Sequence, residues 1–139
     1  LAGLAGWEGI ALAALGLLLI AVALLLHRLI GALFLVAGLG KLGDVAGFSG
    51  YLASGGLPAF LAWPSVIFEI VLGLALIAGF QTRVFALLGA AFCIVAAFLY
   101  HFNPADQMQM SIFLKNLAIA GGFLLLASVG AGRFAVDKA

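Results

Sequence analysis

"WPSVIFEIVLGLALIAGFQTRVFALLGAAFCIVAAFLYHF", residues 63–102, holds two apolar runs that are separated by the residues Gln81, Thr82 and Arg83. Each run approaches the roughly 20 residues that an α-helix needs to cross a bilayer at about 1.5 Å per residue. A connection this short joins antiparallel neighbours. The stretch therefore predicts two membrane-spanning helices, 63–80 and 83–102, that form a hairpin.

The whole chain has the composition of a membrane protein. Of its 139 residues, 67% are hydrophobic and 8% are charged, which is too little polar surface to cover a water-soluble globule. Two more apolar segments, about 21–42 and about 110–129, are long enough to span. The predicted fold class is all-α, a transmembrane four-helix bundle with no separate soluble module. The net charge of +1 argues against a nucleic-acid partner.

The first apolar region is longer than one crossing needs. It runs from residue 4 to residue 42 with His27 and Arg28 as its main polar interruption. About 39 helical residues would reach roughly 58 Å, about twice the hydrocarbon core. A tight turn at 27–28, one long helix beyond the bundle, and a bend along the interface or a partner all stay open. Glu8 is the only charge before His27, so we expect no removed targeting segment.

We divide the chain into an N-terminal apolar helical extension, residues 1–20, and a four-helix transmembrane domain, residues 21–139. A free apolar extension would be unstable in water. We therefore expect residues 1–26 to dock onto other membrane protein subunits.

A short helix is predicted between the first two spans. Asp44 suits a helix N-cap, "VAGFSGYLAS" has an amphipathic pattern, and Gly55, Gly56 and Pro58 end it. We expect an interfacial or reentrant helix that covers one mouth of the bundle. Aromatic residues of this region belong at headgroup depth: Phe48, Tyr51, Phe60 and Trp63.

The basic residues predict the orientation. Arg83, Arg133 and Lys138 belong to the end that holds the 81–83 loop and the C-terminus. Because cytoplasmic loops carry an excess of Lys and Arg, this end is predicted to be cytoplasmic. The expected location is the bacterial inner membrane, with several crossings and a cytoplasmic C-terminus.

Polar residues of all four spans fall at one depth. Lys41 ends the first span, Glu69 is six residues into the second, His101 ends the third, and Lys115 and Asn116 are about five residues into the fourth. A lone charge in lipid costs at least about 2.5 kcal/mol, so such residues turn inward and pair. We expect Glu69 to lie between Lys41 and Lys115, with Asn116 closing a hydrogen-bonded network.

This cluster has two interpretations. It is either a structural clamp that fixes helix register, or the lining of a pocket for a flat ring with carbonyl or hydroxyl groups, for which a quinone is the candidate. In the pocket, Glu69 or His101 would exchange a proton, and Lys115 or Asn116 would hold a carbonyl oxygen. Phe68 and Phe113 are considered as further walls. The candidate ligand-binding residues are Lys41, Trp63, Glu69, Tyr100, His101, Lys115 and Asn116.

Other cofactors are disfavoured. Bis-histidine haem needs two histidines at one depth, and His27 and His101 are predicted near opposite faces. Two lysines would repel a metal ion, so no metal site is expected. Cys93 is the only cysteine, which argues against a dithiol enzyme of the vitamin K epoxide reductase type and makes it a small core residue. No covalently bound cofactor is expected.

Several segments resemble the DoxX family of small bacterial membrane proteins: "GLGKL" (38–42), Glu69 in the second span, "GFQTR" (79–83), "FLKNLAIAGG" (113–122) and "GAGRF" (130–134). The resemblance extends over about residues 21–137 and implies a four-helix bundle in the inner membrane. It also places the following residues on characteristic positions of the family: Lys41, Glu69, Arg83, His101, Lys115 and Asn116.

The activity implied by this resemblance is a supporting one. The family is named for a subunit attached to a terminal quinol oxidase, and relatives are linked to thiosulfate:quinone oxidoreduction. The resemblance thus implies a small accessory subunit of a quinone-linked redox complex, leaning away from an enzyme that acts alone. A self-contained quinone-linked oxidoreductase and a structural or assembly protein without a ligand stay open.

Overall fold

The computed structural model describes residues 2–132 and 135–137, with the side chains of all of these except 2–5, 23 and 24. Its helices are α1 (Ala2–Lys41), α2 (Val45–Ser54), α3 (Ala62–Ala78), α4 (Thr82–Ala96) and α5 (Gln107–Val129). A 3-10 turn, Ala59–Leu61, leads into α3, and a π-helical turn, Ala97–His101, continues α4. Within the described residues, four helices are long and apolar enough to cross a membrane. The predicted all-α architecture is confirmed.

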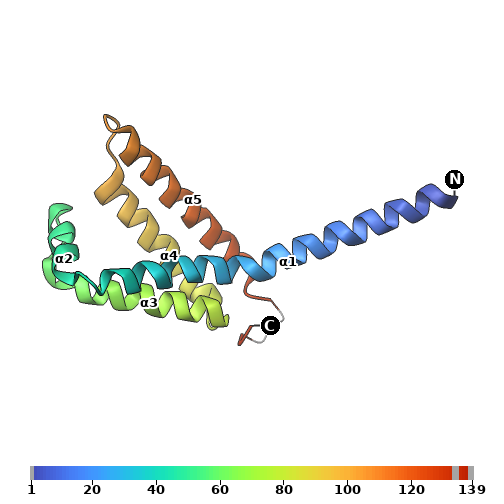
Figure 1. The fold of residues 1–139 in the computed structure, drawn as a ribbon, viewed down its shortest axis with the longest axis horizontal. Helices are drawn as coiled ribbons and strands as arrows, with labels where there is room; N and C mark the ends of the chain where they lie inside the picture. The colour runs from blue at the N-terminus through green and yellow to red at the C-terminus, as the bar shows by residue number, and fades with distance from the viewer. Residues whose placement is uncertain (1, 133–134, 138–139) are drawn as a thin grey trace.

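Helix α1 is one continuous helix of 40 residues. At about 1.5 Å per residue it is roughly 60 Å long. Figure 1 shows that its first half projects away from α3, α4 and α5. Large apolar side chains on this half are exposed, such as Trp7 (73%) and Leu17 (69%). Of the three paths considered for this region, the structure has the single long helix.

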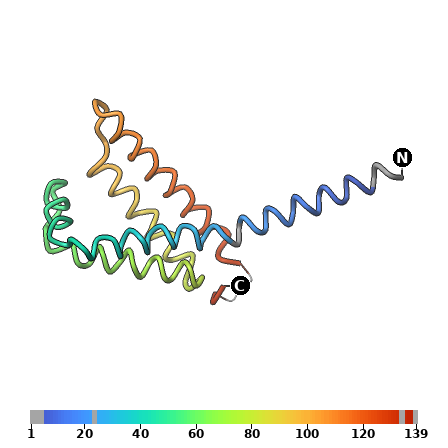
Figure 2. The backbone as a smooth tube through the Cα atoms, viewed as in Figure 1, coloured from blue at the N-terminus to red at the C-terminus, as the bar shows by residue number. Residues whose placement is uncertain are grey.

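The second half of α1 packs along α3, and α5 packs along α4. Glycines allow the first of these pairs to come close: a methyl group on Gly38 would lie 2.8 Å from Ile70 Cγ1 and 3.1 Å from Glu69 Cβ. The two pairs meet near residues 79–81 and diverge toward α2 (Figure 2). We call the end where the pairs meet, which also holds residues 130–132 and 135–137, the tail end. We call the opposite end, where the pairs lie apart, the α2 end.

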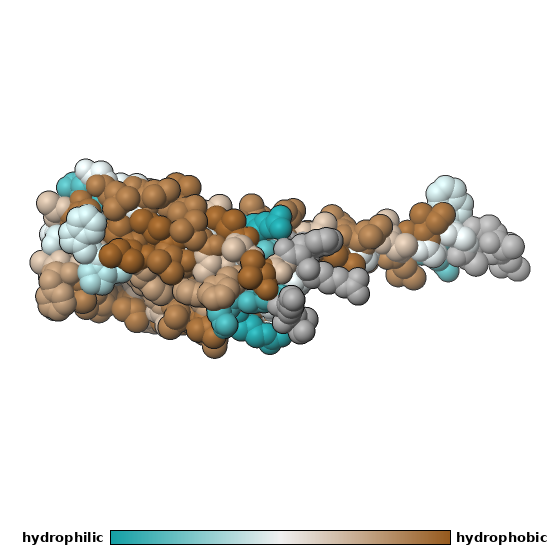
Figure 3. Space-filling view, turned by 90° about the horizontal axis from the view of Figure 1, so that it is seen from below, coloured by the Kyte–Doolittle hydropathy of each residue, from teal (hydrophilic) through white to brown (hydrophobic). Residues whose placement is uncertain are grey.

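Where the pairs meet, apolar side chains of both form the core. Phe34 and Leu76 come from α1 and α3, and Phe123 and Cys93 come from α5 and α4. Cys93 is 2% exposed, as expected for a small core residue. Around this core the visible face is apolar, and hydrophilic residues gather toward the two ends of the bundle (Figure 3). This distribution fits a bundle whose long direction crosses the bilayer.

Helix α2 follows α1 and lies across one end of the bundle (Figure 1), as predicted for the short helix between the first two spans. The Asp44 side chain caps it by accepting a hydrogen bond of 2.8 Å from the Gly47 backbone N–H. The helix stops at its C-cap, Gly55. Both signals are local, which is why the sequence predicts this helix correctly.

At the tail end, the C-terminal segment folds back onto the α3–α4 turn. Gln81 has a left-handed backbone (φ 47°), and Asp137 accepts hydrogen bonds from the Gln81 N–H (2.6 Å) and the Thr82 N–H (2.7 Å). Desolvation raises the pKa of Asp137, but these hydrogen bonds outweigh it and lower the pKa overall. Asp137 therefore acts as the missing N-cap of α4. Arg133 and Lys138, used to predict orientation, lie outside the described residues.

Candidate functional site

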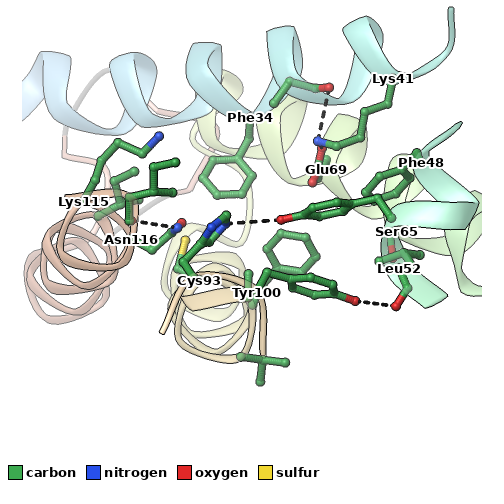
Figure 4. A pocket seen from close by; sticks show the side chains of 18 of the residues that line it. Phe34, Lys41, Phe48, Leu52, Ser65, Glu69, Cys93, Tyr100, Lys115 and Asn116 are labelled. Carbon is green, nitrogen blue, oxygen red and sulfur yellow. Dashed lines mark hydrogen bonds and ion pairs between the residues drawn. The ribbon is translucent and has the colours of Figure 1, made fainter. Parts of the chain in front are cut away.

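A cavity of about 590 Å³ lies between the two helix pairs, above the apolar core and toward the α2 end (Figure 4). Its aromatic lining residues are Phe34, Phe48, Tyr51, Phe92 and Tyr100. Its polar lining residues are Lys41, Ser65, Glu69, His101, Lys115 and Asn116. The cavity exists because the two helix pairs diverge toward the α2 end, and their side chains do not fill the space between them.

An ion pair forms one wall of this cavity. Lys41 Nζ lies 2.6 Å from Glu69 Oε2, donates a second, longer hydrogen bond of 3.4 Å to the Ala37 carbonyl, and sits 5.2 Å from the centroid of the Phe48 ring. The Lys41 side chain is 28% exposed and that of Glu69 is 6% exposed. The carboxylate is thus buried and neutralised by a cation that still reaches polar surroundings. The predicted pairing of Lys41 with Glu69 is confirmed.

The predicted second partner of Glu69 is wrong. In the described part of the chain, the ion pair within 4 Å is that of Lys41 with Glu69, and Lys115 does not join it. Figure 4 shows Lys115 on the far side of the cavity, reaching from α5 toward α1. Asn116 donates to the Ile112 carbonyl of its own helix at 3.1 Å. Lys115 has the predicted depth, but α5 belongs to the pair that diverges from α1 and α3, so the distance is too large.

Two stacked tyrosines line the cavity at its α2 end. The rings of Tyr51 and Tyr100 stack with centroids 4.7 Å apart, and the Tyr100 hydroxyl donates to the Leu52 carbonyl at 2.9 Å. Tyr100 belongs to the π-helical turn, a rare form that re-aims side chains and is frequent at functional sites. Burial and, to a smaller degree, the neighbouring Tyr100 raise the pKa of Tyr51. Tyr51 therefore keeps its proton at neutral pH and can donate it in a hydrogen bond.

His101 connects this tyrosine to the first turn of α5. Its Nδ1 lies 2.9 Å from Gln109 Oε1, and its Nε2 lies 3.5 Å from the Tyr51 hydroxyl. If Nδ1 donates to the Gln109 oxygen, Nε2 is an acceptor that faces the Tyr51 hydroxyl. His101 thus links α2 to α5 at the boundary between the α2 end and the cavity.

Most of the predicted site residues meet in this cavity, but Trp63 does not. The predicted residues that line it are Lys41, Glu69, Tyr100, His101, Lys115 and Asn116. Trp63 is 56% exposed and lies outside the lining. Six residues of α-helix turn by about 600°, which sets Trp63 roughly 120° away from Glu69 around α3. Phe68 and Phe113 are also outside the lining and pack on Phe92 and Phe98 instead.

Sequence reasoning missed several lining residues. Phe34 lies seven residues before Lys41 on α1, so the helical period alone could have placed it on the same face. Phe48 and Tyr51 were expected at headgroup depth, yet both line the cavity. No local signal predicts this, because it depends on how α2 docks against the π-helical turn.

Comparisons with known proteins agree on one family. The DoxX family profile matches residues 22–102. The chain is 42% identical over 106 residues to the inner membrane protein YqjF of Escherichia coli (strain K12), an alignment that covers 76% of this chain and 82% of that protein. It is 32% identical over 113 residues to the inner membrane protein YphA of the same organism, covering 76% of this chain and 81% of the relative. No solved structure matches the chain. The protein belongs to the DoxX family.

Proposed function

We propose that this protein is a small inner-membrane subunit that binds a quinone-type ring in its central cavity and serves a membrane redox complex. The observation that carries the proposal is the cavity of about 590 Å³, with aromatic walls and a few convergent polar groups. Ligand pockets typically have about 300–1,000 Å³, mostly apolar walls and a small number of placed polar groups.

The polar groups suit a ring with oxygen atoms at its edge. Lys115 and the Tyr51 hydroxyl are donors for a carbonyl oxygen, and they come from different helices. His101 Nε2 lies near the Tyr51 hydroxyl and is placed to take or give the proton of a quinol hydroxyl. The rings of Phe34 and Phe92 offer apolar faces for the body of the ligand.

We assign the chain a binding role and leave electron transfer to partners. Its single cysteine and two histidines provide no dithiol and no histidine pair at one depth. The exposed apolar half of α1 is the candidate docking segment for a partner subunit (Figure 1). Removing residues 2–20 would then release the partner from the purified complex while the cavity keeps its ligand.

We further propose that the relatives' inner-membrane location applies here, with the α2 end periplasmic and the tail end cytoplasmic. The support is Arg83 at the tail end, where the positive-inside rule expects basic residues. Labelling of single cysteines in intact cells tests this, with Ser54→Cys expected to react from the periplasm in a Cys93→Ala background.

The test of the quinone site is a titration of the purified protein with decyl-ubiquinone by calorimetry. Glu69→Gln keeps the shape of the side chain but removes the charge that balances Lys41, and we expect a folded protein with weaker binding. Glu8→Gln, in the exposed part of α1, is the matched control and should bind as the wild type does.

The alternative is a structural clamp without a ligand, which the short Lys41–Glu69 ion pair favours. Under this alternative, Glu69→Gln loses the folded protein, and the wild type binds no quinone. A folded Glu69→Gln variant with lost quinone binding would instead support the pocket.

A further inference from the structure

Aromatic contacts bound the cavity on two sides. On the side between α3 and α4, Phe68 packs on Phe92 with ring centroids 5.3 Å apart. Toward the core, Phe34 packs edge-on against Phe123 at 5.3 Å and closes the floor. A ligand of ring size therefore meets packed aromatic rings in both directions.

At the α2 end, the stack of Tyr51 on Tyr100 lies across the cavity. Above the Phe34–Phe123 contact at the floor, the side between α1 and α5 has no such aromatic contact among the described residues. These two helices also have few contacts with each other. Two residues at this side line the cavity and also reach the surface: Leu33 of α1, which is 50% exposed, and Lys115 of α5, which is exposed. At this depth the surface faces hydrocarbon, so the gap leads sideways into the bilayer.

The charge at this gap is unbalanced. Lys41 neutralises Glu69 at 2.6 Å, and among the described residues no carboxylate lies within 4 Å of Lys115. Figure 4 shows the Lys115 side chain extended from α5 toward α1, at the edge of the cavity. An ammonium group at membrane depth is stabilised by an oxygen acceptor or an anion. The gap therefore presents a cation to whatever passes through it.

We propose that the ligand enters the cavity sideways from the bilayer between α1 and α5, and that it is an amphiphile whose oxygen-acceptor head binds Lys115. Its hydrocarbon chain leaves past Leu33 into the lipid. This inference rests on the proposed function in taking the cavity for a ligand site, and it adds the entrance and the class of ligand. A membrane quinone and a fatty acid share this chemistry, and the experiments below separate them.

The first experiment measures how much the hydrocarbon chain of the ligand improves its binding. The affinity of the purified protein for decyl-ubiquinone is divided by its affinity for ubiquinone-0, which has the same ring without the chain. Leu33→Trp should lower this ratio roughly tenfold, because it fills the gap through which the chain leaves. Val95→Trp and Leu29→Trp should leave the ratio unchanged.

Both controls are matched to Leu33. Val95 lines the cavity from α4 and is 52% exposed. Leu29 is one turn from Leu33 on α1, is 66% exposed, and lies outside the lining. A ratio that falls for Val95→Trp and stays constant for Leu33→Trp would overturn the proposed entrance.

The second experiment tests the head group with oleate and oleyl alcohol, which share one chain and differ in the charge of the head. The wild type should bind oleate roughly tenfold more tightly. Lys115→Met should abolish the preference, and Lys115→Arg should retain it. Lys115→Arg is also the control for misfolding, since it keeps the charge and approximate length of the side chain. An unchanged preference in Lys115→Met would overturn the role of Lys115.

The two proposals fail in different ways. If decyl-ubiquinone does not bind but oleate binds with dependence on Lys115, and Leu33→Trp weakens that binding while Leu29→Trp does not, the inference holds and the quinone proposal is wrong. If the quinone binds without dependence on Lys115 or Leu33, the site is a quinone site and the inference is wrong. If neither ligand binds, both are overturned.

Discussion

Gly31 of α1 and Gly73 of α3 meet backbone to backbone. A methyl group on Gly31 would lie 2.8 Å from the Gly73 carbonyl oxygen, and one on Gly73 would lie 2.7 Å from the Gly31 carbonyl oxygen. Neither position has room for a side chain. This close approach holds α1 against α3 and allows the Lys41–Glu69 ion pair to form further along the same two helices.

Gly73→Ala is expected to destabilise the protein by about 1–3 kcal/mol, the usual cost of overpacking. The atoms that the new methyl group would meet, Leu35 N, Gly31 O and Leu35 Cα, belong to the backbone and cannot rotate away. Thermal unfolding in detergent micelles measures the loss. Gly121→Ala is the control, because nothing lies within 4 Å of the added carbon. Equal melting temperatures for the two variants would contradict this account.

The two halves of the Lys41–Glu69 ion pair should respond unequally. Lys41→Met leaves a carboxylate that is only 6% exposed without its counter-ion, whereas Glu69→Gln leaves an ammonium that is 28% exposed. Breaking a buried ion pair costs about 3–5 kcal/mol, and we expect Lys41→Met to approach this range and Glu69→Gln to cost less. Chemical denaturation of both single variants and of the double variant measures the coupling. A double variant as unstable as the sum of the singles would show that the pair contributes nothing.

Tyr100→Phe should loosen α2 without unfolding the spans. The substitution removes the donor of the 2.9 Å hydrogen bond to the Leu52 carbonyl, worth about 1 kcal/mol, but keeps the ring that stacks on Tyr51. Hydrogen exchange followed by mass spectrometry should show faster exchange in residues 45–54. Tyr51→Phe is the matched control, because among the described residues its hydroxyl contacts His101 alone, at 3.5 Å. Faster exchange in the control than in Tyr100→Phe would be the opposite of this expectation.

Asp137→Asn should weaken the attachment of the C-terminal segment in a pH-dependent manner. The folded state lowers the pKa of Asp137 from 3.8, so the ionised carboxylate stabilises the folded state fully above this value. The stabilisation is lost as the pH falls through the lowered value. The wild type should therefore be more resistant than the variant to carboxypeptidase at pH 7. Melting temperatures of the two proteins should converge at acidic pH, and a constant difference down to pH 2 would refute the role of the charge.

Much of the site could be predicted from depth along each helix. Counting residues from the ends of the spans puts Lys41, Glu69, His101 and Lys115 at one level, and the structure brings all four to one cavity. Depth does not give the rotation of a helix about its axis or its distance from a neighbour. Depth alone therefore predicts Trp63 in the site, although it does not line the cavity, and pairs Lys115 with a carboxylate that Lys41 neutralises.

The sequence by itself determined the helical spans, their hairpin connection and the capped helix α2. In hydrocarbon every backbone N–H and C=O must be satisfied within its own segment, so apolar length alone specifies a helix. Only the tertiary structure decided that the two helix pairs diverge and leave a cavity, and that Lys115 stands at its open side. Hydropathy carries no such information, because a lipid chain and a neighbouring helix are equally apolar surroundings for a leucine.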